Sequence, residues 1–147
     1  MIWLWLLLGI LFFVILLLGY RVLVGIGRRR VEEVQQKLGT ESILCMAASA
    51  NCFGVQSGGY GQIRGNGVLA LTGDELYFLM WIPKREITIP TASITGVDTP
   101  KSHLGKTKMQ PLLKVEFNNI DEEADSVAWL VPDLEEWERQ VRKVSGA

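Results

Sequence analysis

The chain has 147 residues, and its 15 basic and 16 acidic residues leave a formal net charge of −1. The part that follows the N-terminal apolar segment is mildly acidic, which argues against a general nucleic-acid binder. The cysteines, Cys45 and Cys52, are too few for a disulfide framework, and with His103 as the only histidine they match no zinc motif.

The first segment contains no charged residue from Ile2 to Tyr20, and a basic cluster follows at residues 28–30. At about 1.5 Å per residue, a helix over this run is about as long as the hydrocarbon core of a bilayer is thick. Trp3 and Trp5 lie near one end of the run and Tyr20 near the other, where aromatic rings favour the headgroup level. The segment predicts a single transmembrane anchor at residues 1–27.

Three other interpretations fit this segment less well. A cleaved secretory signal normally has a positive n-region and a shorter apolar stretch, and neither is present. A buried helix of a soluble protein seldom lacks polar residues over such a length. A helix that associates with others in the membrane gains no specific support, because no G-x-x-x-G spacing occurs among Gly9, Gly19, Gly25 and Gly27.

The orientation of the anchor follows from its flanking charges. No Lys or Arg precedes the span, whereas Arg21 and the basic cluster follow it. The positive-inside rule then predicts an N-terminus outside and a cytoplasmic C-terminal domain, at the plasma (inner) membrane.

Residues 28–40 predict a juxtamembrane helix that continues out of the membrane as a stalk. Glu33 is spaced to pair with Lys37 one turn later, and Gly39 is a natural stop. The residues expected on its apolar face are Val31, Val34 and Leu38.

Residues 41–147 have the size of one domain and mostly follow a period of two, which is typical of strands. The most distinct unit is a hairpin that turns at Gly73-Asp74. The expected strands are residues 43–50, 68–72, 76–82, 87–89, 94–97, 113–117 and 127–131.

The period changes to that of a helix after Asp133. This residue is a candidate N-cap, Glu136 completes a capping box, and Trp137 lies on the apolar stripe. The fold class expected is therefore a single transmembrane α-helix plus a mainly-β roll of about seven antiparallel strands, capped by a C-terminal α-helix.

The order of these motifs resembles that of GRAM and bacterial pleckstrin-homology-like (PH-like) domains over roughly residues 41 to 145. The residues that carry the resemblance are Gly67-Val68-Leu69-Ala70-Leu71-Thr72, Leu76-Tyr77-Phe78, Ile87-Thr88-Ile89-Pro90, Ile94-Thr95-Gly96-Val97 and Trp137. It implies a strongly bent sheet capped by a helix and an adaptor that binds lipid headgroups, membranes or proteins. Inositol-phosphate binders of the family place several Lys and Arg between their first two strands, whereas residues 51–66 here contain only Arg64.

Motifs that would indicate an enzyme are incomplete. Gly105-Lys106-Thr107 lacks the earlier glycine of a phosphate-binding loop, because position 100 is proline. His103 has no specified nucleophile or acid partner, and we expect it to be an exposed loop residue. The acidic run at residues 121–125 does not fit a calcium loop and is expected to be a solvated turn. An uncharacterised enzyme is therefore only a remote alternative.

The function expected is that of a membrane-anchored adaptor at the cytoplasmic face, which binds a protein partner or a second copy of itself. The alternative is a sensor of anionic lipid headgroups that uses the Lys-rich loop at residues 100–108. No cofactor, metal, nucleic acid or small-molecule substrate is expected. The candidate membrane or lipid contacts are Arg28, Arg29, Arg30, Lys101, Lys106 and Lys108. The expected structural core is Leu69, Leu71, Leu76, Phe78, Ile89, Ile94, Trp129 and Trp137.

Overall fold

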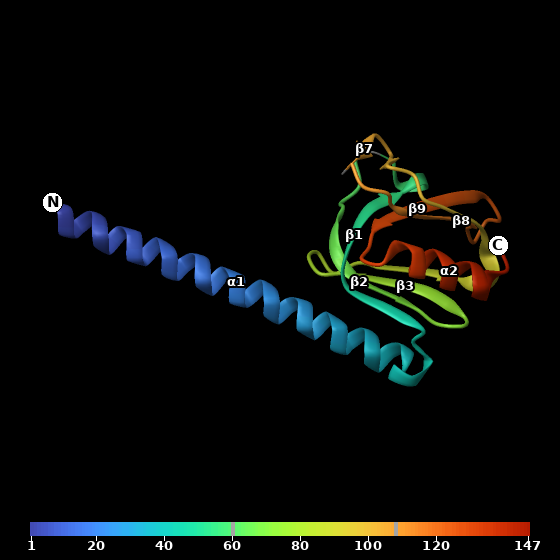
Figure 1. Cartoon of the computed structure of the whole chain (residues 1–147), viewed down its shortest axis with the longest axis horizontal. Coiled ribbons are helices and arrows are strands. Elements are labelled where there is room, and N and C mark those ends of the chain that lie inside the picture. The colour runs from blue at the N-terminus through green and yellow to red at the C-terminus, as the bar shows by residue number, and fades with distance from the viewer. Residues whose placement is uncertain (60, 108) are drawn as a thin grey trace.

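A computed structural model describes residues 1–59, 61–107 and 109–147 (Figure 1). The predicted order of a long apolar helix, a seven-stranded antiparallel sheet and a C-terminal helix is confirmed. The helices and strands are α1 Ile2–Leu38, β1 Cys45–Val55, β2 Gly65–Leu71, β3 Glu75–Met80, β4 Glu86–Pro90, β5 Ile94–Asp98, β6 Ser102–His103, β7 Lys106–Thr107, β8 Leu113–Asn118, β9 Ala124–Leu130 and α2 Leu134–Ser145. Short 3₁₀ turns lie at Thr40–Ser42, Gln56–Gly58 and Thr91–Ser93.

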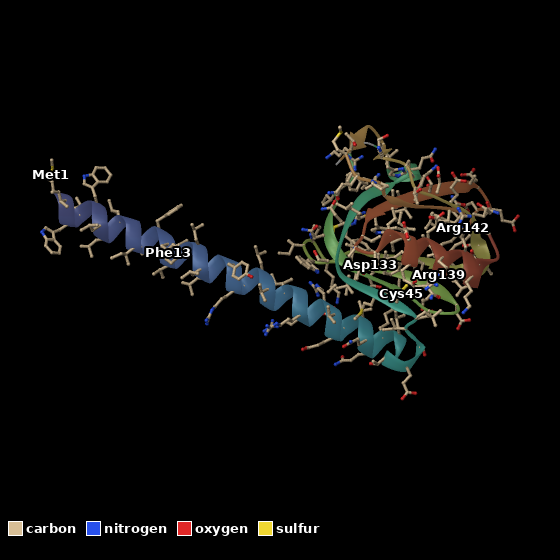
Figure 2. All side chains as sticks on the ribbon, in the orientation of Figure 1. Met1, Phe13, Cys45, Asp133, Arg139 and Arg142 are labelled. Atoms are coloured by element: carbon tan, nitrogen blue, oxygen red, sulfur yellow. The ribbon has the colours of Figure 1, made fainter. Side chains whose placement is uncertain are left out.

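Helix α1 is one unbroken helix of 37 residues, about 55 Å long. Its most apolar window has a mean hydropathy of 2.8 and no buried residue, so by length and composition this helix is able to cross a bilayer. Side chains of its first half, such as Phe13, project from the ribbon into open space (Figure 2). The helix ends where predicted, because Gly39 adopts a φ of 79° that favours glycine.

The strands of the main sheet follow the order β4-β3-β2-β1-β9-β8-β5. The predicted hairpin is β2 and β3, in which Leu69 lies opposite Phe78. The hydroxyl of Thr72 fixes its turn by accepting hydrogen bonds from the N–H groups of Asp74 and Glu75 at 3.2 and 3.1 Å. Since successive side chains point to opposite faces, this hairpin has one face toward the main core and one toward α1.

Strand β1 lets the sheet bend, because it pairs with β2 along one part and with β9 along another. Its register shifts between Ala47 and Ala50 against β2, and between Cys52 and Gly54 against β9. Gly54 has a φ of 103°, which a residue with a side chain rarely adopts. Bulges of this kind increase local twist, and the sheet curls so that β2–β3 and β8–β9 enclose one core (Figure 1).

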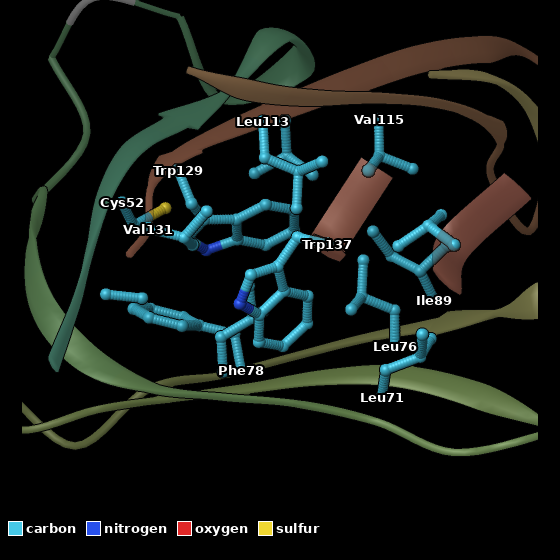
Figure 3. Packing of buried hydrophobic residues seen from close by; sticks show 14 of the residues in the cluster. Cys52, Leu71, Leu76, Phe78, Ile89, Leu113, Val115, Trp129, Val131 and Trp137 are labelled. Atoms are coloured by element: carbon cyan, nitrogen blue, oxygen red, sulfur yellow. The ribbon is translucent and has the colours of Figure 1, made fainter. Parts of the chain in front are cut away.

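The core inside the curled sheet is closed by α2, which contributes the buried Trp137 (Figure 3). The Phe78 and Trp129 rings pack against each other with their centroids 5.9 Å apart. Every residue of the expected structural core lies in this cluster: Leu69, Leu71, Leu76, Phe78, Ile89, Ile94, Trp129 and Trp137.

The start of α2 differs from the predicted capping box. Asp133 precedes the helix but adopts a left-handed conformation with a φ of 51°, and its side chain forms no capping hydrogen bond. A capping side chain normally needs an extended backbone at this position. Glu136 instead accepts hydrogen bonds from Arg139 and Gln140 within the helix. The helix was predicted correctly, but the capping box is wrong.

Candidate interaction surfaces

The second half of α1 packs against the outer face of β2 and β3. Val34 is fully buried there, in a cluster with Val68, Tyr77 and their apolar neighbours. Gly27 lies directly on an indole ring, since an added Cβ would come within 3.3 Å of the Trp81 side chain. The residues expected to form a stalk are therefore fixed to the sheet by side-chain packing.

Ion pairs between α1 and the β3–β4 segment surround this contact. Lys84 donates to Glu33 at 2.7 Å, and Lys37 donates to Glu86 at 2.8 Å. These hydrogen bonds lower the pKa values of the Glu33 and Glu86 carboxyls. The predicted Glu33–Lys37 pair is wrong, because each of these residues finds a partner on the sheet instead.

The three arginines of the basic cluster at residues 28–30 differ in their exposure. Arg28 and Arg29 are exposed. Arg30 is half-buried, pairs with Glu33 at 2.8 Å and donates to the Trp81 carbonyl at 3.3 Å. Of the three arginines, Arg28 and Arg29 are therefore free to reach outward, whereas Arg30 is part of the contact between α1 and the sheet.

The Lys-rich loop contains a small hairpin of β6 and β7 that has no counterpart in the predicted strands. Lys101 and Lys106 are exposed on it, and Lys108 lies outside the described residues. His103 is buried, with its Nε2 atom 3.0 Å from the Gly54 carbonyl oxygen. The expectation of an exposed histidine is wrong, because the hairpin turns this ring onto β1. Burial lowers the pKa of His103.

A pocket of about 240 Å³ lies between β1, the start of β2 and the small hairpin. Arg64 and Lys106 contribute its cationic side chains. The Nε and Nη2 atoms of Arg64 are buried without a hydrogen-bond partner, and Arg64 forms no ion pair within the described part of the chain. The sequence singled out Arg64 only as a lone cation and did not predict its proximity to Lys106.

An apolar groove of about 420 Å³ runs beside strand β4, at one edge of the sheet. Its lining includes Ile87, Phe117 and Ile120, and Ile120 is fully exposed. The N–H of Met80 donates a hydrogen bond to the carbonyl of Arg85. In an antiparallel pair, every second residue of a strand bonds to the neighbouring strand and the residues between them point away from it. Counted from Arg85, the N–H and C=O of Thr88 point away from β3, toward the free edge. At the other end of the sheet, Arg142 of α2 donates to the carbonyl of Val97 in β5.

The acidic run forms the turn between β8 and β9. Glu122 and Glu123 are exposed, as predicted for a solvated turn, and the Asn119 side chain accepts hydrogen bonds that shape it. Asp125 differs, because it is buried and accepts hydrogen bonds from the N–H and hydroxyl of Ser57 at 3.0 and 2.6 Å. No group of three or more metal-ligating side chains occurs among residues 1–59, 61–107 and 109–147.

The cysteines are free thiols in β1. Desolvation raises the pKa of Cys45 to about 12 and that of Cys52 to about 11. Since the thiolate is the reactive form, both side chains act as small apolar residues at neutral pH.

Comparisons with known proteins identify the fold and no family. No family model matches the chain, and no curated protein matches it in sequence. A solved C-terminal domain of an unknown protein from Leishmania infantum is similar with a TM-score of 0.54 and 12% identity, over 80% of this chain and 99% of that chain. A chain of the 8S snRNP assembly intermediate is similar with a TM-score of 0.56 and 9% identity, over 71% of this chain and 83% of that chain. At these identities the similarity establishes a shared fold alone.

Proposed function

We propose that this chain is a single-pass membrane protein whose PH-like domain is a non-enzymatic interaction module at the cytoplasmic face of the plasma (inner) membrane. The apolar first half of α1 supports the membrane anchor, since its side chains have no protein neighbour to cover them. The arginines after the apolar run support the orientation. The bent sheet with its C-terminal helix supports the PH-like assignment.

The ligand proposed is a protein partner, and the groove beside β4 is the observation that carries this proposal. A free strand edge offers N–H and C=O groups to an extended segment of another chain. The adjacent Ile87, Phe117 and Ile120 offer apolar surface for side chains of that segment. Confinement to one membrane raises the local concentration of the partners, so that a weak contact is sufficient.

Photo-crosslinking in native membranes tests this proposal. A benzoylphenylalanine placed at Ile120 should crosslink one distinct protein, whereas the same group at the exposed Arg139 of α2 should not. Thr88→Pro removes the outward N–H and should abolish the crosslink, and Thr88→Val retains the N–H and should preserve it. Equal crosslinking from both positions, or no effect of Thr88→Pro, would contradict a partner at this edge.

Anionic lipid headgroups are a second candidate ligand, at the Lys-rich loop of residues 100–108. The exposed Lys101 and the proximity of Lys106 to Arg64 favour this candidate. Basic residues near a membrane attract anionic lipids at about 1 kcal/mol each, and this attraction weakens as salt increases. The exposed Arg28 and Arg29 would add to it.

A further inference from the structure

Among the described residues, the pocket between Arg64 and Lys106 is lined by two cations and by no carboxylate. The Thr107 hydroxyl is already satisfied, since it donates to the Lys101 carbonyl at 2.6 Å and accepts from the Met109 N–H at 3.0 Å. The amide nitrogen of Asn51 donates to Asn66 at 2.8 Å. The charged donors left for a ligand are therefore the Arg64 guanidinium and the Lys106 ammonium.

The guanidinium of Arg64 lacks hydrogen-bond acceptors for its buried nitrogens. Two of its three guanidinium nitrogens, Nε and Nη2, are buried without a partner, and buried charges are normally paired. Burial lowers the pKa of the His103 imidazole, and the charges of Lys114 and Arg64 lower it further. Arg64 has no carboxylate partner within the described residues.

We propose that this pocket binds one phosphate group, held by the planar fork of Arg64 and the point charge of Lys106. An arginine pairs with two phosphate oxygens at once, and a lysine adds a compact charge beside it. The phosphate belongs either to a lipid headgroup or to a free phosphate compound. This inference deepens the second candidate function, because it assigns the anion to one defined pocket instead of to the whole Lys-rich loop.

Titration of the full chain with inorganic phosphate tests the pocket itself. The chain is reconstituted in nanodiscs of phosphatidylcholine, and the ³¹P linewidth of phosphate reports binding. Arg64→Gln should weaken binding by about tenfold or more, because it removes a charged hydrogen-bonding group. Lys106→Gln should weaken it several-fold, and it should fold normally because Lys106 is exposed.

The matched control is Lys143→Gln, which removes the same charge from an exposed lysine of α2 that lies outside the pocket lining. It should change phosphate affinity by less than about twofold, since exposed charges are screened. Equal losses from Lys143→Gln and Lys106→Gln would show delocalised attraction and would overturn the proposal. Absence of phosphate binding by the unmodified chain would overturn it as well.

Native mass spectrometry of the full chain from detergent micelles distinguishes the two sources of phosphate. If the source is a lipid, one phosphatidic acid molecule should remain bound where phosphatidylcholine does not, and Arg64→Gln should release it. Phosphate binding without retained phosphatidic acid would identify a free phosphate compound as the ligand. This result would refute the lipid candidate and would leave the proposal of a phosphate-binding pocket intact. The crosslink at Ile120 does not depend on either result. A failure of the protein-partner proposal is therefore distinguishable from a failure of the phosphate proposal.

Discussion

The two halves of α1 have the same backbone geometry and opposite surroundings. In the first half every side chain from Ile2 to Tyr20 is exposed, although nearly all of them are apolar. In the second half, Gly27 and Val34 are buried, and Glu33 and Lys37 form ion pairs with Lys84 and Glu86 of the β3–β4 segment. A helix that is apolar on every side is stable only where apolar surroundings cover it completely, as in a bilayer. An amphipathic helix needs only one protein surface to cover its apolar side. This contrast supports the proposal that one helix combines a bilayer anchor with a support for the domain.

Insertion of charge into the first half should give the largest effect. The double variant Leu11→Arg, Val14→Arg places two cations near the centre of the proposed span, at a cost of about 3 kcal/mol each on insertion scales. We expect the chain to leave the membrane fraction, which fractionation of cells by centrifugation measures. Gln36→Arg in the second half is the control and should leave the chain in the membrane, because Gln36 is exposed beside the domain. Release of the control as well would contradict the division of α1 into two halves.

A charge at the buried position of the second half should give an intermediate effect. Val34→Asp buries a carboxylate that has no partner in its apolar cluster, a change that costs several kcal/mol. We expect this end of α1 to detach from β2 and β3 while the domain core stays folded. Hydrogen exchange of the amides of residues 28–38 should accelerate by a hundredfold or more, and Gln36→Asp should not produce this change. Unchanged exchange in Val34→Asp would show that the packing of α1 does not stabilise its position.

Acidification should give the smallest effect. The pKa values of Glu33 and Glu86 are lowered when they pair with Lys84 and Lys37. Their pairing therefore stabilises the contact above the ordinary carboxyl value of 4.5 and is lost as the pH falls through the lowered values. Because these carboxyls are partly exposed, hydrogen exchange of residues 28–38 should accelerate by less than about fivefold, after correction for intrinsic rates. The double variant Glu33→Gln, Glu86→Gln should lose this pH dependence, and its persistence would indicate another titrating group.

The sequence predicts those parts of the molecule that depend on local pattern. The uninterrupted apolar run predicts the first half of α1, the alternation around Gly73-Asp74 predicts the β2–β3 hairpin, and the spacing of Trp137 predicts the apolar stripe of α2. These patterns come from the periods of helix and strand and need no knowledge of distant partners.

The features that the sequence did not predict depend on contacts between distant residues. The Glu33–Lys84 pair replaces a pair one helical turn apart, and β6 and β7 are two residues each, too short to show a period. His103 is buried because Gly54, 49 positions away in sequence, provides its hydrogen-bond acceptor. The pocket at Arg64 and the groove beside β4 likewise arise only when the sheet curls.

Extraction of membranes with alkaline carbonate is the measurement that tests the central claim most directly. The claim is that the first half of α1 lies within lipid while its second half holds the domain at the membrane surface. We expect the full chain to remain in the membrane pellet at high pH, because alkaline conditions remove charge-dependent attachments and leave apolar insertion intact. Recovery of the full chain in the carbonate supernatant would contradict this account.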